Sequence, residues 1–326
     1  MSAEWREADV VTELWDRVLH QRGEQAALAV TDGSILVHER RTRLVRLDPA
    51  DGSVAWDVPV RTWPRALVAA GSRVLVLPQD RSALSCLSLA TGATRWQADL
   101  ARFTGHVTVA DGAVLTGGWR GYTPLRAFDL TDGRLLWQTP ERAVTQRPVA
   151  WAGGLLLGDG ARAWLIDPRT GHERQSWQLA EAMADADLRG LFTVLDADRC
   201  AVRCGPSAVA VLRRTTGRAE LLIADENPLH PEAPLLAHGL LWLRRYRTLG
   251  GLAVDPADGS TVHRADARIH LARGVLPPAS FVTAAGTAVR PDGSTVRLGT
   301  RITAVRPLGP GRVLAVTRNS LRAYRL

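Results

Sequence analysis

The chain has 326 residues, of which 46% are hydrophobic and 23% are charged, a composition typical of a folded protein and too apolar for a disordered one. The chain has 41 basic residues, all of them Arg, and 33 acidic residues, so the net charge is +8. There is no lysine for a Walker-type phosphate loop, a protein-kinase site or a Schiff base. The absence of Lys and the scarcity of Asn resemble the codon bias of a GC-rich genome, such as that of an actinobacterium.

Residues 1–25 predict two short elements ahead of the rest of the domain. Trp5 indicates a strand, and residues 8–22 carry an apolar stripe at helical spacing, formed by Val11, Leu14, Trp15, Val18 and Leu19. This stripe predicts a short helix that packs on the domain or, alternatively, binds a partner. The first residues show no basic leader and no apolar core, and no apolar run approaches the length of a membrane span, so we expect a cytoplasmic protein.

A repeat of about forty residues fills the chain from 26 to 326. Its clearest copies are LVRLDPADGSVAW at 44–56, LSCLSLATGATRW at 84–96 and LRAFDLTDGRLLW at 125–137. Weaker copies follow at 163–177, 208–220, 251–263 and 286–297. The turn glycines of the copies are Gly52, Gly92, Gly133, Gly171, Gly217, Gly259 and Gly293.

Each copy reads as a strand, a tight turn and a second strand. The turn glycine supplies a positive φ, the Asp or Thr before it bonds the turn backbone, and the Trp that follows is large enough to pack on a neighbouring repeat. Two more short strands precede each copy, for example 66–70 and 73–77. Four strands in about forty residues make one blade of a β-propeller.

The last repeat is incomplete, because 302–306, 312–317 and 320–326 supply three strands. We therefore predict an all-β, single-domain propeller of eight four-stranded antiparallel blades over residues 1–326, whose ring is closed by an N-terminal strand. Seven blades remain the alternative if the repeat near 280–298 is degenerate.

The repeat resembles that of the pyrroloquinoline-quinone-like propeller family, which ends in Ala-x-Asp-x-x-Thr-Gly-x-x-x-Trp. The resemblance implies the propeller fold. Members of the family include quinoprotein dehydrogenases, a non-enzymatic outer-membrane assembly lipoprotein and other binding proteins. The dehydrogenases carry an adjacent-cysteine disulfide and acidic and amide ligands to calcium. Cys86, Cys200 and Cys204 include no adjacent pair. We therefore expect no pyrroloquinoline quinone and no other cofactor, and we expect the cysteines to be buried, structural thiols without a metal.

The predicted topology sorts the loops onto two faces. The turns between the third and fourth strands lie on one side together with the loops between the first and second strands. This side is here called the turn face, and its repeated turns carry Asp48, Asp51, Asp129, Asp132, Asp167, Asp255 and Asp258. The loops between the second and third strands and the links between blades lie on the other side, here called the funnel face. The funnel face is predicted to be basic, aromatic and His-containing.

The funnel face supplies the candidate site residues. Arg suits carboxylate or phosphate groups, and Trp or Tyr adds flat apolar contact, so the candidate ligand-binding residues are Trp63, Arg65, Trp119, Tyr122, Arg147, Arg189, Arg244, Tyr246, Arg268 and Arg301. His106 and His270 are candidate acid–base groups. The alternative is that these residues have no binding or catalytic role: the arginines and aromatics are then solvent-exposed residues around the funnel, and the histidines are hydrogen-bonded residues at strand ends.

Two functions compete. The first is a binding propeller that holds an anionic small molecule or an acidic protein segment on the funnel face. The alternative is a cofactor-independent lyase, cyclase or hydrolase of specialised metabolism that uses His and Arg side chains. Nucleic acid is not expected as a partner, because the basic residues are scattered and no recognition motif is present. No membrane partner is expected either, and the sequence does not determine the oligomeric state.

Overall fold

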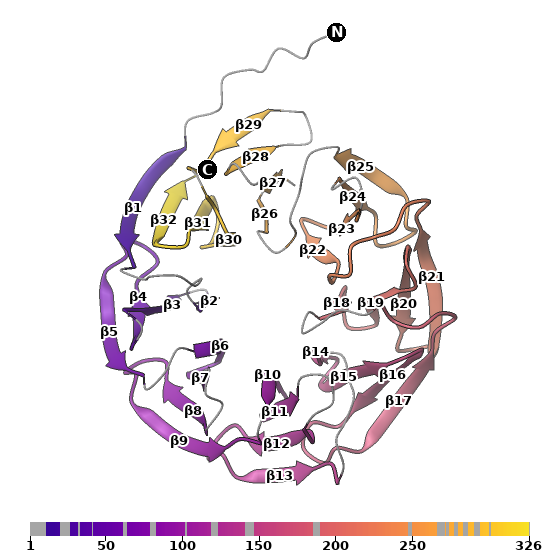
Figure 1. Cartoon of the computed structure of the whole chain (residues 1–326), viewed down its shortest axis with the longest axis horizontal. Helices are drawn as coiled ribbons and strands as arrows, with labels where there is room; N and C mark the ends of the chain where they lie inside the picture. The colour runs from indigo at the N-terminus through magenta and orange to yellow at the C-terminus, as the bar shows by residue number, and fades with distance from the viewer. Residues whose placement is uncertain are drawn as a thin grey trace.

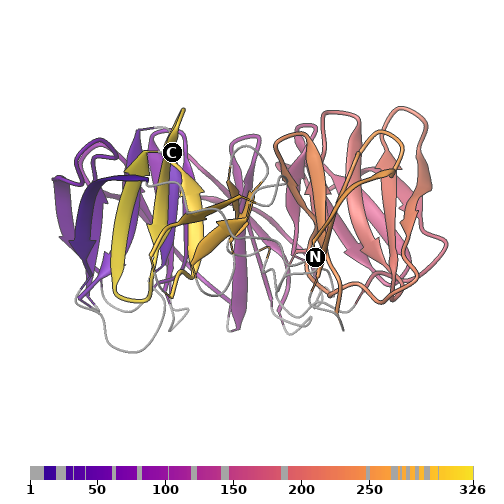
Figure 2. The same cartoon turned by 90° about the horizontal axis from the view of Figure 1, so that it is seen from above.

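The computed structural model describes residues 11–19, 27–31, 33–40, 42–60, 64–78, 83–101, 103–118, 123–140, 147–184, 190–246, 250–265, 271, 274–276, 280–282, 286–289, 294–299 and 301–325. Within these residues the chain forms eight four-stranded antiparallel sheets. The sheets stand side by side as the blades of a ring (Figure 1), and the strands run across the thickness of the disc (Figure 2). The fold is therefore the β-propeller that the repeat predicts.

The first half of the ring follows the chain without interruption. Blade 1 contains β2 (Leu28–Thr31), β3 (Ser34–Glu39), β4 (Arg43–Leu47) and β5 (Val54–Pro59). Blade 2 contains β6 (Pro64–Ala70), β7 (Arg73–Pro78), β8 (Ala83–Ser88) and β9 (Thr94–Asp99). Blade 3 contains β10 (Thr104–Ala110), β11 (Ala113–Gly118), β12 (Arg126–Asp129) and β13 (Leu135–Gln138). Blade 4 contains β14 (Val149–Trp151), β15 (Gly154–Asp159), β16 (Arg162–Ile166) and β17 (Glu173–Gln178).

The second half ends in a blade shared by the two ends of the chain. Blade 5 contains β18 (Phe192–Val194), β19 (Arg199–Cys204), β20 (Ala208–Arg213) and β21 (Arg218–Ala224). Blade 6 contains β22 (Leu235–Ala237), β23 (Leu240–Arg244), β24 (Gly251–Val254) and β25 (Thr261–Ala265). Blade 7 contains β26 (Val275–Leu276), β27 (Ser280–Val282), β28 (Thr287–Val289) and β29 (Thr295–Arg297). Blade 8 contains β30 (Ala304–Pro307), β31 (Arg312–Val316), β32 (Ser320–Arg325) and, as its outermost strand, β1 (Thr12–Val18).

The N-terminal strand closes the ring. β1 pairs antiparallel with β32, from Thr12 opposite Arg325 to Val18 opposite Ser320, and Figure 1 shows the two strands side by side. The pairing covers the edge that β32 would otherwise expose. The eight sheets agree with the prediction of eight blades rather than with the alternative of seven.

The prediction of an N-terminal helix is wrong. Within residues 8–22, the described segment forms the extended strand β1 instead. The helical spacing of the apolar residues arises partly from a bulge between Glu13 and Trp15, which shifts the alternation of the strand by one residue. Trp5, where the closing strand was expected, lies outside the described residues, and Trp15 occupies the position of the blade Trp.

A Trp on the outermost strand joins each of several blades to the next. The indole N–H groups of Trp15, Trp56, Trp96 and Trp137 donate to the carbonyls of Pro49, Leu89, Leu130 and Pro168 over 3.2, 2.8, 3.0 and 2.9 Å. In each case the ring covers the turn glycine of the next blade. At Gly133 (φ +78°), for example, an added Cβ would lie 2.6 Å from the Trp96 ring. The Gly and the Trp of the repeat are therefore two halves of one contact between neighbouring blades.

The hydrophobic core is likewise divided among the interfaces between blades. One cluster joins blades 4 and 5 around Trp177 of β17 and around Cys200 and Cys204, which share one face of β19. Another joins blades 8 and 1 around Trp15, Val37 and Leu321, and thus packs both ends of the chain against the first blade. Each blade therefore depends on its neighbours for burial.

The aspartates of the turn face have a structural role. The Asp48 carboxylate accepts from the Ala50 N–H over 2.7 Å, and Asp51 accepts from the Ser53 N–H over 2.8 Å. The same pattern recurs at Asp129 and Asp132, at Asp167, and at Asp255 and Asp258. These carboxylates thus close turns, as the repeat predicts.

Asp167 is expected to make the stability of the fold dependent on pH. Burial raises the pKa of this carboxyl, but hydrogen bonds from Arg174 and from the backbone N–H groups of Thr170 and Arg169 lower it by more. The net result is a pKa of about 2, below the ordinary 3.8. Because the pKa is depressed in the folded state, the stabilisation is present above the ordinary pKa and is lost as the pH falls towards about 2. Thermal unfolding should therefore separate the native chain from Asp167→Asn at pH 6 but not near pH 2; a separation that persists at low pH would contradict this assignment.

Candidate functional site

Two cavities in the described part of the chain bear on the predicted site. The first, of about 580 Å³, opens on the funnel face, because its lining comes from the link into blade 5, the β19–β20 loop and the link into blade 6. We call it the Arg203 pocket. The second, of about 350 Å³, lies among the innermost strands of blades 2 to 5 and is called the Arg147 cavity.

Half of the predicted site residues lie in the described part of the chain. These are His106, Arg65, Arg147, Arg244, Tyr246 and Arg301. His270, Trp63, Trp119, Tyr122, Arg189 and Arg268 lie outside the described residues. Arg65 is half-buried at the start of β6, and Arg301 is exposed in the link that enters blade 8. The predicted residues therefore occupy different blades, and the structure brings together only smaller groups of them.

The first group is formed by His230, Glu232, Arg244 and Tyr246 on blade 6 and is called the Arg244 cluster. Glu232 Oε1 lies 3.7 Å from the Arg244 guanidinium and 3.6 Å from His230 Nδ1, and the rings of His230 and Tyr246 stack with centroids 5.7 Å apart. Two backbone bonds fix this geometry: the His230 N–H donates to the Arg244 carbonyl, and the Tyr246 N–H donates to the Pro228 carbonyl. Tyr246 is 56% exposed, so much of this side chain faces solvent.

The neighbouring arginine has a different role. Arg245 Nη2 forms an ion pair with Asp225 over 2.9 Å, and both side chains are largely buried. This pair ties the β23–β24 loop to the link that leaves blade 5, because Asp225 directly follows β21. The arginines of this loop are therefore not equivalent, and we treat Arg245 as structural.

Arg203 is a site residue that sequence reasoning missed. It lies in β19, is only 1% exposed, and lines the Arg203 pocket. Its guanidinium donates to the carbonyls of Pro206, Ala208 and Leu229, and therefore holds together the β19–β20 loop, β20 and the link into blade 6. The signal that could have found it is an Arg in the interior of the strand Arg199–Cys204, whose other interior residues are apolar.

The charge of Arg203 is not balanced within the described part of the chain. Burial lowers its pKa to about 10, and no described carboxylate lies within ion-pair distance of it. Its Nε has no hydrogen-bond partner among the described residues. Glu181 lines the same pocket from the rim and is exposed. The pocket thus combines a buried cation in its wall with an acid at its opening.

His106 is buried and lies near Arg147. Its ring packs over Gly117 in β11, where an added Cβ would lie 2.4 Å from Nε2. Burial, together with the positive charge of Arg147, lowers the pKa of His106 to about 3. Neither imidazole nitrogen has a hydrogen-bond partner in the described part of the chain. A histidine in this setting stays neutral at physiological pH, so the setting does not favour a role as a general acid or base.

The three cysteines pack in the core. Cys86, Cys200 and Cys204 are all buried free thiols, and burial raises the pKa of each. Across the described residues, no group of three or more His, Cys, Asp or Glu side chains is arranged to hold a metal ion. The same residues include no helix long and apolar enough to span a bilayer.

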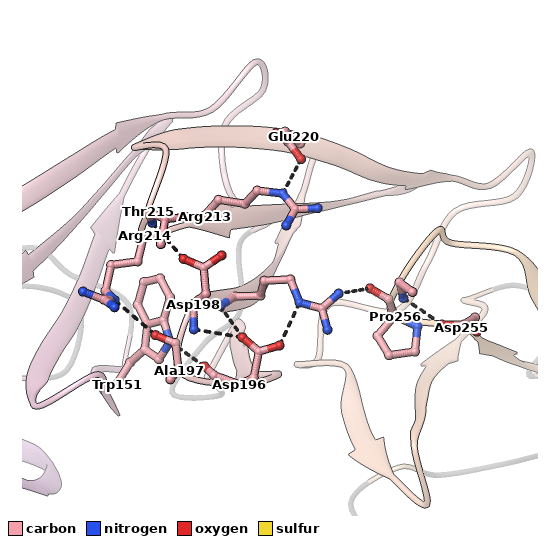
Figure 3. A network of polar contacts seen from close by, with 12 residues as sticks. Trp151, Asp196, Ala197, Asp198, Arg213, Arg214, Thr215, Glu220, Asp255 and Pro256 are labelled. Atoms are coloured by element: carbon pink, nitrogen blue, oxygen red, sulfur yellow. Dashed lines mark hydrogen bonds and ion pairs between the residues drawn. The ribbon is translucent and has the colours of Figure 1, made fainter.

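The turn face of blade 5 shows how the opposite side of the ring is used. Figure 3 shows Asp196 and Asp198 in a network that reaches Trp151 of blade 4 and Pro256 of blade 6. Asp196 accepts from Arg199 over 2.8 Å, and Arg199 donates in turn to the Pro256 carbonyl over 2.9 Å. The bonds between blades are made by the Asp196 carbonyl, which accepts from the Trp151 indole, and by Arg199, which the Asp196 carboxylate holds in place.

Known proteins resemble this fold over almost the whole chain. The crystal structure of BamB from Moraxella catarrhalis matches with a TM-score of 0.72 at 17% identity, covering 97% of this chain and 100% of that one. A computationally designed protein, Ika8, matches with a TM-score of 0.72 at 12% identity, covering 96% and 99%. The WD40 domain of Neurospora crassa Pan2 matches with a TM-score of 0.58 at 12% identity, covering 98% and 97%.

These likenesses show the fold alone. No protein of curated function matches the sequence. The sequence does match the family described as outer membrane protein assembly factor BamB, in two overlapping segments, residues 9–84 and 60–262. Together they span well over half of the chain and include the clear repeats. The chain belongs to the BamB family of pyrroloquinoline-quinone-like β-propellers.

Proposed function

We propose that this chain is a non-catalytic binding propeller whose funnel face holds an acidic segment of a partner protein. The observation that carries the proposal is Arg203, a fully buried guanidinium in the wall of an open pocket of about 580 Å³. A buried charge is stabilised by a partner of opposite sign, and none of the described carboxylates is in ion-pair contact with it. A carboxylate from outside the chain would supply that partner.

The surroundings of the pocket favour a protein segment over a small anion. Leu229 and Pro231 line the pocket, and His230 between them belongs to the Arg244 cluster, so the two sites are continuous along the surface. The exposed ring of Tyr246 adds the flat apolar contact that protein interfaces use. The family description, that of an assembly factor, agrees with a protein partner.

We propose further that binding takes place in the cytoplasm and needs no cofactor. Cys200 and Cys204 are four residues apart in the core and have no adjacent-cysteine geometry to offer a quinone. The alternative, a cofactor-independent enzyme, would rely on His106, which is buried with a depressed pKa, or on His270. No observation on the described residues favours that chemistry.

Charge substitutions at the pocket rim test the proposal with an octaglutamate peptide as the probe. Arg203 itself is unsuitable, because its hydrogen bonds hold three segments in place. Ala182 is exposed and lines the pocket. Ala182→Glu should weaken octaglutamate binding by about fivefold and Ala182→Arg should strengthen it by a similar factor, measured by isothermal titration calorimetry at low salt.

The control is Ala197→Glu, which places the same charge on an exposed residue of the turn face in the same blade. This variant should leave octaglutamate binding unchanged. Raising the salt from about 50 to about 300 mM should weaken the native complex markedly, and octalysine should not replace octaglutamate. Binding that is independent of salt, or equal for the two Ala182 variants, would refute an acidic partner at this pocket.

A further inference from the structure

The Arg147 cavity has the composition of a small-ligand site. Its walls are largely apolar and come from the innermost strands of four consecutive blades, with Val68 from β6, Val107 from β10, Val149 from β14 and Phe192 from β18. Figure 1 shows these four strands next to one another around the centre of the ring. Arg147 is the charged residue of the lining. A largely apolar cavity of about 350 Å³ with one charged group in its lining is typical of a ligand pocket.

Arg147 is held in place by the neighbouring blade. The Thr108 hydroxyl of β10 donates to the Pro148 carbonyl over 3.0 Å, which ties the residue after Arg147 to blade 3. Pro148 is itself buried. Arg147, which lines the cavity, therefore extends from an anchored backbone, and this anchoring lowers the entropic cost of binding a ligand.

The charge of Arg147 has no counter-ion among the described residues. The surrounding strands lower its pKa by desolvation, and no described acid offsets that effect. The side chain nevertheless remains accessible. Arg147 thus differs from the arginines of the turn face, such as Arg169 and Arg174, which pair with Asp129 and Asp167.

We propose that the Arg147 cavity binds a short-chain aliphatic monocarboxylate, with the carboxylate on the Arg147 guanidinium and the alkyl tail against the valines and Phe192. A single guanidinium matches one carboxylate in a two-point contact, whereas a dianion would bring a second charge that no described group in the lining neutralises. The valine walls add the apolar contact that a tail requires.

This ligand site is separate from the proposed docking of an acidic segment. The Arg203 pocket and the Arg147 cavity share no lining residue. One site lies on the funnel face over blades 5 and 6, and the other among the inner strands of blades 2 to 5. The two proposals can therefore fail independently.

Calorimetric titration of the full chain at pH 7 with hexanoate, acetate and hexanol tests this inference. Hexanoate should bind with one site per chain, and acetate and hexanol should each bind at least about tenfold more weakly, because one lacks the tail and the other lacks the charge. Arg147→Met should weaken hexanoate binding by about tenfold or more. Ala150→Leu, which fills the cavity from β14, should abolish it. In spectra of ¹³C-labelled protein, the signal of the His106 ring should shift on titration with hexanoate.

The matched control is Arg218→Met, which removes an exposed arginine from the turn face of blade 5 and should leave hexanoate binding unchanged. Circular dichroism establishes that each variant is folded. Equal hexanoate binding by the native chain, Arg147→Met and Ala150→Leu would overturn the proposal, as would no binding to the native chain. Ala182→Glu should not alter hexanoate affinity; displacement of hexanoate by octaglutamate would overturn the separation of the two sites.

Discussion

Replacing Trp15 with Ala should lower the free energy of unfolding by about 3–5 kcal/mol, the usual cost of deleting a buried Trp. Trp15 is 9% exposed and belongs to the cluster that packs blade 8 against blade 1. Its indole covers Gly52, where an added Cβ would lie 2.8 Å from the ring, and donates to the Pro49 carbonyl. The substitution therefore removes both the packing and the hydrogen bond at the closure of the ring.

Trp15 differs from the other blade tryptophans in how its strand is connected to the rest of its blade. Trp56 is held in a blade whose four strands follow one another in sequence, whereas β1 is attached to β32 only by noncovalent pairing. Trp15→Ala should therefore increase amide hydrogen exchange along β32, while Trp56→Ala should leave exchange in β32 unchanged.

Chemical denaturation measures the stability loss, with Val18→Ala as the control on the same strand. Val18 is 55% exposed, so its truncation should change the free energy of unfolding by less than about 0.5 kcal/mol. A Trp15→Ala variant as stable as Val18→Ala would contradict the role of β1 as the clasp of the ring.

The sequence predicted the repeat unit better than the ends of the chain. The spacing of the turn glycines and tryptophans reflects a contact that recurs between blades, so the pattern is visible without coordinates. Residues 8–22 are not part of this repetition, and the spacing of their apolar residues by itself fits a helix. The segment forms a strand because its pairing with β32 satisfies the backbone N–H and C=O groups along the edge of β32, which a helix at this place would leave without partners.

The candidate site was less predictable for a geometric reason. The Arg203 pocket draws its lining from three segments that are adjacent only after blades 5 and 6 have packed. The sequence placed Arg244 and Tyr246 on the same face, but the distance from Arg244 to Glu232 depends on how two loops fold against each other. Arg203 was missed because its strand reads as core, and its guanidinium donates to carbonyls whose positions no local pattern encodes.

Replacing Gly259 with Ala should destabilise the fold far more than replacing Gly239 with Ala. Both glycines belong to blade 6, and both have a φ of +76°, so the backbone strain of an L-residue, about 1–2 kcal/mol, is common to the two variants. The space around them differs. A Cβ at Gly239 meets nothing within 4 Å, whereas at Gly259 it would lie 2.1 Å from the Leu222 carbonyl oxygen.

The clash at Gly259 involves backbone, so it cannot be relieved by turning a side chain. Leu222 lies in β21, the outermost strand of blade 5, and the turn of blade 6 packs directly on that strand. Relief would require the two blades to move apart, which adds about 1–3 kcal/mol of overpacking to the shared strain. In blades 1 to 4 the corresponding glycine is covered by a Trp ring of the preceding blade, so the approach of the Leu222 carbonyl to Gly259 is the closest contact of this kind among the described turn glycines.

Urea denaturation of the two variants side by side provides the measurement. Gly239→Ala should lose about 1–2 kcal/mol and Gly259→Ala about 2–5 kcal/mol, with similar dependence on urea concentration. Equal losses would mean that conformational strain alone governs these turns and that the blade interface can adapt to a methyl group. A larger loss at Gly259 would instead show why the turn glycine is retained in a blade that has no Trp to cover it: the approach of the neighbouring backbone leaves no room for a side chain.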